Sequence, residues 1–212
     1  MTTSALSLYN GALRNIKSRA LSALTDTDEA RYKLDEVYSD TKNLCLSMGS
    51  WNFAGRSVAI EAATDVEPEF GYSYAVEKPS DWVRTVSIAG NGDFWPVAQA
   101  GEYVDEGEYW NCNVDPLYVR YISNHTSYGG DLSLWSIAFV RYVEWELAVA
   151  VAPHLTAMSA AELDRLDERR QRALRTARSL DASNQAPDRK PVGRLVLART
   201  GGRSNMGPRR QW

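Results

Sequence analysis

The chain has 212 residues, of which 44% are hydrophobic, so it is long enough for one domain with a sizeable core, or for one domain plus an appendage. No apolar run approaches the roughly 20 residues that span a bilayer, and residues 1–4 do not begin a secretory signal. Cys45 and Cys112 are too few for a disulfide framework or a zinc cluster. We therefore expect a soluble protein of a reducing, intracellular compartment.

The net charge is only −3, but the charges are unevenly distributed. Residues 61–115 hold twelve acidic residues against two basic ones, whereas residues 181–212 hold seven basic residues against two acidic ones. Such asymmetry is typical of a protein whose surfaces meet different neighbours. A solvated acidic domain with a soluble tail would give the same distribution.

Two helices are predicted at the start of the chain. Apolar residues recur at helical spacing from Leu6 to Leu24, which predicts an amphipathic helix. Asp26, followed three residues later by Glu29, resembles a capping box that would start a second helix, and Gly49 would end it as a left-handed cap. The short polar link between the helices predicts an antiparallel hairpin over residues 5–54.

Between residues 55 and 127 the pattern changes to short runs typical of strands, at Ser57–Ile60, Val83–Ile88 and Leu117–Ile122. The last run alternates two sets of side chains: Leu117, Val119 and Tyr121 against Tyr118, Arg120 and Ile122. Asn91-Gly92 predicts a hairpin turn between the strand ending at Ile88 and Phe94. The many aromatic residues here favour packing in a small sheet, with a binding surface as the alternative.

Two further helices are predicted after this region. Asp131 can cap a third helix that runs to Ala152 and stops at Pro153, and this helix is apolar nearly all round, so it should be buried and central. Ser159 with Glu162 predicts a capping box for a fourth helix, whose outer faces are rich in arginine.

These elements together predict a mainly α fold of the α+β class. Residues 5–54 and 128–181 would form a four-helix bundle, with a small β-rich insert at residues 55–127 between the second and third helices. Residues 182–212 would be a flexible, basic C-terminal arm, because they are rich in Gly and Pro and offer little to build a core. An apolar patch at residues 192–197 is typical of a segment that becomes ordered on a partner, although an inert linker is the alternative.

Motifs for catalysis or metal binding are not found in the sequence. It has no P-loop, no dinucleotide fingerprint, no H-E-x-x-H and no G-x-S-x-G. Cys112 and His125 could act as a nucleophile and a base, but nothing else in the sequence supports that pairing. The acidic run Asp105–Glu108 lacks calcium-loop spacing and is typical of a solvated loop. We expect no enzyme activity, no cofactor and no metal.

Several segments, in this order, resemble the bacteriophage head-to-tail adaptors related to tail tubular protein A. Lys78–Val86 (KPSDWVRTV) is similar to the P-x-D-W-x-R stretch of that family, and Asp115–Ile122 is similar to the Y-x-x-x-Y/F strand that follows it. Trp51–Phe53 resembles the G-W-x-F junction of the family, with the glycine displaced to Gly49. Phe139–Pro153 and the Arg-rich helix after it also fit, so the resemblance covers about residues 5–181.

The resemblance implies a structural virion protein at the head–tail junction, assembled in the host cytoplasm. Such adaptors stack as a homo-oligomeric ring, usually of twelve copies, below the portal protein, and the tail proteins of the nozzle or tube attach to them. Genomic DNA passes through the channel without specific binding, and the acidic residues of 61–115 would repel its phosphates from the lumen. The nearest alternative is a tail terminator or completion protein, and a nucleic-acid-binding protein is a further one.

The resemblance also implies two groups of contact residues. The arm is similar to the C-terminal arms of adaptors that dock into the portal, and its contact residues would be Val192, Arg194, Leu195, Val196, Leu197, Arg199, Arg203 and Trp212. The residues that would face the tail or a ring neighbour are Trp82, Arg84, Phe94 and Trp95.

Overall fold

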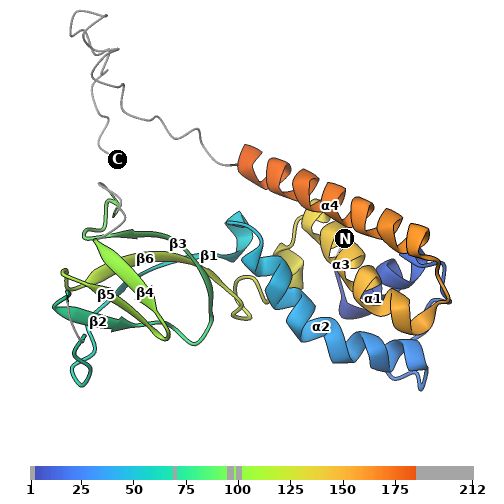
Figure 1. Cartoon of the computed structure of the whole chain (residues 1–212), viewed down its shortest axis with the longest axis horizontal. Helices are drawn as coiled ribbons and strands as arrows, with labels where there is room; N and C mark the ends of the chain where they lie inside the picture. The colour runs from blue at the N-terminus through green and yellow to red at the C-terminus, as the bar shows by residue number, and fades with distance from the viewer. Residues whose placement is uncertain (1–2, 69–70, 95–97, 99–101, 185–212) are drawn as a thin grey trace, which may run out of the picture.

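The computed structural model describes residues 3–68, 71–94, 98 and 102–184. The molecule is elongated, with the helices at one end and the strands at the other (Figure 1). The helical unit comprises α1 (Ala5–Asn15), α2 (Glu29–Ser47), η2 (Leu132–Leu134), α3 (Ile137–Leu155) and α4 (Ala160–Ser183). The β unit follows the short helix η1 (Asn52–Ala54) and comprises β1 (Gly55–Ile60), β2 (Tyr74–Glu77), β3 (Trp82–Ala89), β4 (Tyr103–Glu106), β5 (Tyr109–Cys112) and β6 (Leu117–Ser123).

The predicted four-helix bundle with a small insert is wrong. Helices α1, α2 and α4 pack mainly on α3 and not on one another, whereas each helix of a bundle shares a core with its neighbours. This arrangement is possible because α3 offers fully buried apolar side chains over a wide face, among them Phe139, Tyr142, Val143, Leu147 and Val151. The β unit is also more than a small insert, because its six strands form two antiparallel sheets with a core of their own.

Helix α1 ends at Asn15, well before the predicted end near Leu24. Lys17 lies in the left-handed region with φ +59°, so the chain cannot continue as a helix there. The side chain of Asn10 then holds the following loop, because its Oδ1 accepts from the N–H of Leu21 at 2.7 Å and its Nδ2 donates to the carbonyl of the same residue at 3.0 Å. The apolar spacing that continues to Leu24 therefore belongs to a loop packed on the helical core.

The predicted caps of α2 are also wrong. Asp28, and not Asp26, begins the helix by accepting from the N–H of Ala30 at 3.1 Å. Gly49 is not in the left-handed region, and α2 ends at Ser47. A Cβ at Gly49 would approach the ring of Trp51 to 2.7 Å, so close packing explains the glycine there.

At the third helix, the predicted cap and end are shifted. Asp131 caps η2 by accepting from the N–H of Ser133 at 2.8 Å, and Ser136 caps α3 by accepting from the N–H of Phe139 at 3.2 Å. Helix α3 continues past Pro153 to Leu155, because proline at this point removes a single hydrogen bond in the last turn.

The capping box predicted for the fourth helix is confirmed. Glu162 accepts from the N–H of Ser159 at 3.0 Å, which satisfies a free donor at the start of α4.

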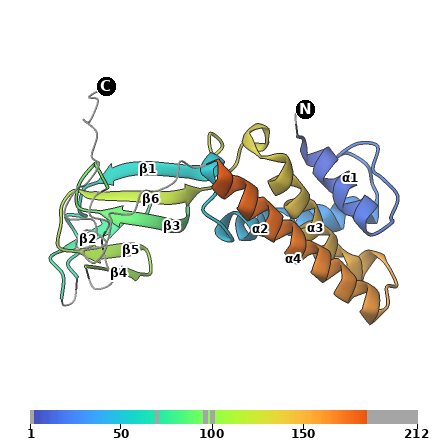
Figure 2. The ribbon, with the colours of Figure 1, turned by 90° about the horizontal axis from the view of Figure 1, so that it is seen from above.

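The β unit consists of two stacked three-stranded sheets, with strand orders β1-β6-β3 and β2-β5-β4 (Figure 2). The three predicted strand runs lie in β1, β3 and β6, so these predictions are confirmed. The alternation in β6 is confirmed as well, because one set of its side chains enters the β-unit core while Ile122 joins the helical core. The core between the sheets contains Val76, Ile88, Trp110, Cys112, Leu117, Val119 and Tyr121.

The outcome of the hairpin predicted at Asn91-Gly92 lies partly outside the described residues, because residues 95–97 and 99–101 are not described. The N–H of Phe94 donates to the carbonyl of Asn91 at 3.2 Å, so the chain turns there, and the N–H of Ala98 donates to the carbonyl of Ile88 at 2.8 Å. A two-residue hairpin lies between β4 and β5, where Gly107 has φ +54° and Glu106 pairs with Tyr109. Glycine adopts this backbone conformation without strain, which is the property such turns require.

Candidate functional site

The segment that resembles the adaptor family folds around the carboxylate of Asp81. This buried group accepts hydrogen bonds from Nη1 of Arg56 at 3.0 Å, from the hydroxyl of Tyr121 at 3.0 Å and from the hydroxyl of Ser123. Arg56 lies on β1, Asp81 directly precedes β3, and Tyr121 and Ser123 lie on β6. A single side chain thus joins all three strands of one sheet.

The electrostatics of Asp81 agree with this structural role. Burial opposes its ionisation, but the hydrogen bonds from Ser123, Arg56 and Tyr121 outweigh burial and lower the pKa of Asp81. Burial and the hydrogen bond to Asp81 raise the pKa of Tyr121 to about 12, so the phenol remains a donor at neutral pH. The carboxylate is therefore held in its ionised form by three donors from the same sheet.

Trp82, predicted to contact the tail or a ring neighbour, bridges the two sheets. Its ring meets that of Trp110 edge-on at 6.4 Å between centroids, and its Nε1 donates to Thr85 at 3.1 Å. The ammonium of Lys78 lies 4.4 Å from the centroid of the same ring and donates to the carbonyl of Gly107 at 2.7 Å. Much of the Trp82 ring is thus engaged inside the β unit, and its role as a partner contact stays a prediction.

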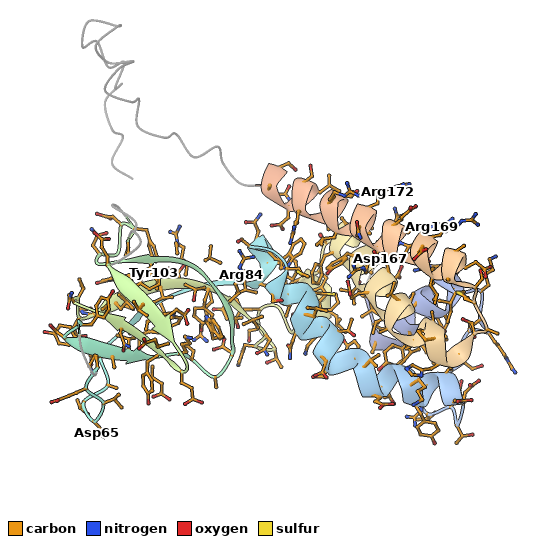
Figure 3. All side chains as sticks on the ribbon, in the orientation of Figure 1. Asp65, Arg84, Tyr103, Asp167, Arg169 and Arg172 are labelled. Atoms are coloured by element: carbon orange, nitrogen blue, oxygen red, sulfur yellow. The ribbon has the colours of Figure 1, made fainter. Side chains whose placement is uncertain are left out.

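Arg84 lies at the boundary between the β unit and the helical unit (Figure 3). Its Nη1 is 3.3 Å from the carbonyl of Ser47, and Nε of Arg178 on α4 donates to the carbonyl of Met48 at 2.8 Å. Both acceptors lie at the C-terminal end of α2, where free carbonyls and the negative end of the helix dipole favour cations. The two arginines line a pocket of about 370 Å³ at this junction.

Asp181 joins the end of α4 to the start of the β unit. Its carboxylate accepts from the backbone N–H of Asn52 at 3.1 Å, and its carbonyl accepts from the side-chain amide of Asn52 at 2.8 Å. Burial raises the pKa of Asp181, although the hydrogen bond from Asn52 acts in the opposite direction. Next to this contact Trp51 is almost fully buried against Phe139, and its Nε1 donates to the carbonyl of Cys45 at 3.0 Å.

A second surface is a groove of about 350 Å³ between α3 and α4. Its lining is largely apolar and includes the exposed side chains of Ile137 and Leu180. Arginines stand along the groove, and Arg169 and Arg172 extend from α4 in Figure 3. The groove combines exposed apolar surface with arginines as its charged residues, and we treat it as the candidate interaction surface.

Of the other predicted contact residues, Phe94 is half-buried and lies under the guanidinium of Arg120, which is 4.0 Å from the ring centroid. Trp95 and all the predicted arm residues lie outside the described residues. They are Val192, Arg194, Leu195, Val196, Leu197, Arg199, Arg203 and Trp212. Their contacts with a portal stay predictions.

Cys112 and His125 have separate partners. The thiol of Cys112 donates to the carbonyl of Val114 at 3.2 Å, and burial raises its pKa. Nδ1 of His125 accepts from the N–H of Ser127 at 3.1 Å. Within residues 3–184, leaving aside the undescribed gaps, no three His, Cys, Asp or Glu side chains are grouped so that they could hold a metal ion. None of the described helices is long and apolar enough to cross a membrane.

Comparison of the sequence with models of known protein families and with curated proteins gives no match.

Sequence reasoning missed the roles of Asp81 and Asp181 as joints between elements, and it missed the groove. The groove had a signal in the sequence, because the Arg-rich face of the fourth helix also carries Ala173 and Leu180. Because the third helix was expected to be buried on all sides, its contribution to an exposed groove was not recognised. In the structure Ile137, in the first turn of α3, is 76% exposed.

Proposed function

We propose that this chain is a structural virion protein, a head-to-tail adaptor that forms a ring below the portal and carries the tail. The observation that carries the proposal is the joint arrangement of two of the segments that resemble the family, residues 78–86 and 115–122. They lead into and include parts of β3 and β6, which pair antiparallel, and Asp81 of the first segment accepts a hydrogen bond from the hydroxyl of Tyr121 in the second. Two separate resemblances thus meet at one structural unit.

The division of the molecule into two units also supports the proposal. An adaptor has to meet like copies at its sides and different proteins above and below, and an elongated chain with a helical end and a β end offers distinct surfaces for these contacts (Figure 1). The proposal needs no four-helix bundle, because the resembling strand segments lie in the β unit.

The charge of the β unit has a consistent role in this proposal. Many of its carboxylates are exposed, among them Glu61, Asp65, Glu67, Glu77, Asp93, Glu106 and Glu108. Where such carboxylates face the channel of the ring, they repel DNA phosphates, so the genome passes without binding.

The test is the mass of the purified protein, by native mass spectrometry or light scattering, with and without the cognate portal. We expect the chain to join the portal as a stoichiometric ring. Failure to bind the portal at any protein concentration, together with binding to tail-tube ends, would favour the alternative of a tail terminator.

A truncation tests the proposed portal arm. The residues of both hydrophobic cores lie between Leu8 and Ala177, so a chain lacking residues 187–212 should fold as the full chain does. It should bind the portal more weakly, because the predicted arm contacts are gone. The matched control is the full-length variant Leu195→Asp, which keeps the arm but places a charge in its apolar patch. Unchanged portal binding by both variants would remove the arm from the proposal.

A further inference from the structure

The groove between α3 and α4 leaves large apolar side chains exposed that the rest of the helical unit does not cover. Ile137 is 76% exposed and Leu180 is 52% exposed, and both line the groove together with Ala138 and Ala173. Burying these aliphatic side chains against a partner would remove their apolar surface from water, which is favourable. Clustered in a groove, they are typical of a surface that a partner covers.

The charged residues that line the groove are all arginines. Arg141, Arg169 and Arg172 are exposed and line it, and the lining includes no carboxylate. The guanidinium of Arg169 lies 5.6 Å from the ring centroid of Trp145, which holds this cation beside the apolar floor. An occupant that fits must therefore bring both an apolar side chain and negative charge.

These requirements separate the possible occupants. The chain beyond residue 184 carries seven basic residues against one acidic residue, so it would meet the arginines with like charge. Nucleic-acid phosphates match the charge of the rim, but they would leave Ile137 and Leu180 in contact with water and ions. The β unit of a second copy offers carboxylates and apolar side chains together.

One segment of the β unit fits both requirements, the loop of residues 61–68 (EAATDVEP), called here the acidic loop. Glu61, Asp65 and Glu67 are exposed, Val66 stands between two of them, and the loop has no basic residue. Its base is held by the backbone N–H groups of Ala62 and Ala63, which donate to Asp115 and Ala75 at 3.0 and 2.8 Å. The segment from Thr64 onward can therefore extend from a fixed base.

The groove and the acidic loop of one molecule cannot meet each other. Asp65 lies at the end of the β unit that is remote from the helical unit, and Arg169 and Arg172 lie on α4 at the other end (Figure 3). We propose that the acidic loop of one copy binds in the α3–α4 groove of the next copy, an assignment that rests on the proposed function. Such a contact joins two different surfaces, so its repetition produces a closed ring when the rotation between copies closes.

Cross-linking between separately purified variants tests this contact directly. Thr64→Cys places a thiol on the acidic loop and Thr176→Cys places one in the groove, while Cys45 and Cys112 are buried and do not compete. A short bismaleimide should join the mixed pair about tenfold more efficiently than the control pair Thr64→Cys with Ser22→Cys, an exposed position away from the groove. A yield equal to that of the control pair overturns the proposal.

Charge reversal then identifies the chemistry of the contact. Adding Arg172→Glu to the groove variant should lower the cross-linking about tenfold, and adding Asp65→Arg to the loop variant should restore it. Loss without rescue, accompanied by weaker DNA binding of the Arg172→Glu protein, would overturn the proposal in favour of a nucleic-acid surface.

The same variants separate this inference from the proposed function. Cross-linking at the control level in a chain that still forms a ring on the portal would overturn the groove contact and leave the adaptor role standing. Efficient, rescuable cross-linking in a chain that never binds the portal would support the contact between copies and remove the adaptor role.

Discussion

Removing the carboxylate of Asp81 should destabilise the protein strongly, and the structure sets the size of the effect. Asp81→Ala leaves the hydroxyls of Tyr121 and Ser123 without this acceptor, and both residues are 0% exposed. A buried donor left unpaired costs about 1–3 kcal/mol. The side chain of Arg56 is 35% exposed and can turn to water, so its lost ion pair adds little. We expect a loss of about 2–6 kcal/mol in the free energy of unfolding, from the two hydroxyls.

The pH dependence of stability provides a second measurement at the same residue. The hydrogen bonds lower the folded pKa of Asp81, so its ionised form stabilises the fold at pH values above the unfolded pKa of about 3.9. That contribution is lost as the pH falls through the folded pKa. Asp81→Asn, which keeps an acceptor oxygen but has no charge to lose, should therefore show a smaller loss of stability below about pH 4 than the unsubstituted chain.

The assay is denaturation by urea at several pH values, followed by tryptophan fluorescence and by far-UV circular dichroism. Two probes are needed because the helical unit and the β unit have separate cores and can unfold separately. The matched control is Asp65→Ala, an exposed carboxylate of the same β unit, which should change stability by no more than about 0.5 kcal/mol. An Asp81→Ala protein as stable as this control would refute the reasoning.

Three further predictions concern the region where the two units meet. Trp51→Ala should lower the free energy of unfolding by about 3–5 kcal/mol, measured by denaturation, because it empties a fully packed aromatic site. Gly129→Ala should lower the free energy of unfolding by about 1–3 kcal/mol, since its Cβ would collide with a backbone carbonyl of β6. The control Gly55→Ala, whose Cβ would have its nearest neighbours at 3.6 Å, should change that free energy little. Equal denaturation midpoints for the two variants would contradict this. Burial raises the folded pKa of Asp181, so the unsubstituted chain loses stability as the pH rises through that pKa and the carboxyl ionises. Asp181→Asn has no such group to ionise and should therefore gain stability relative to the unsubstituted chain over the same pH range. Parallel curves of stability against pH for the two proteins would contradict this.

Local patterns predicted much of the secondary structure. Period-two alternation placed the strand that became β6, and the spacing of Ser159 and Glu162 placed the start of α4. These signals succeed because each depends on residues only two to four positions apart. Where two nearby side chains could each cap a helix, the same reasoning chose the wrong one: Asp26 was predicted to start α2, but Asp28 does.

The arrangement of the elements could not be predicted in this way. Asp81 binds groups 25, 40 and 42 residues away, and Asp181 binds Asn52 across 129 residues. No short-range pattern contains such pairings. The bundle prediction was wrong for a related reason: an amphipathic helix indicates that one face is buried, but not whether it packs on one neighbour or on several. The candidate groove depends on the same missing information, because it forms between two helices.

The way the β unit joins the rest of the chain has a consequence for engineering and evolution. Its first residue, Gly55, pairs with Ile122 near its last, so the chain leaves the helical part and returns to it at neighbouring points. A segment with adjacent ends can be exchanged for another of different length with a small change in loop-closure entropy, since that entropy grows only slowly with length. The helices could therefore serve as a constant frame on which related proteins carry differently shaped modules, and a short glycine linker in place of residues 55–123 should be enough to test whether that frame folds alone.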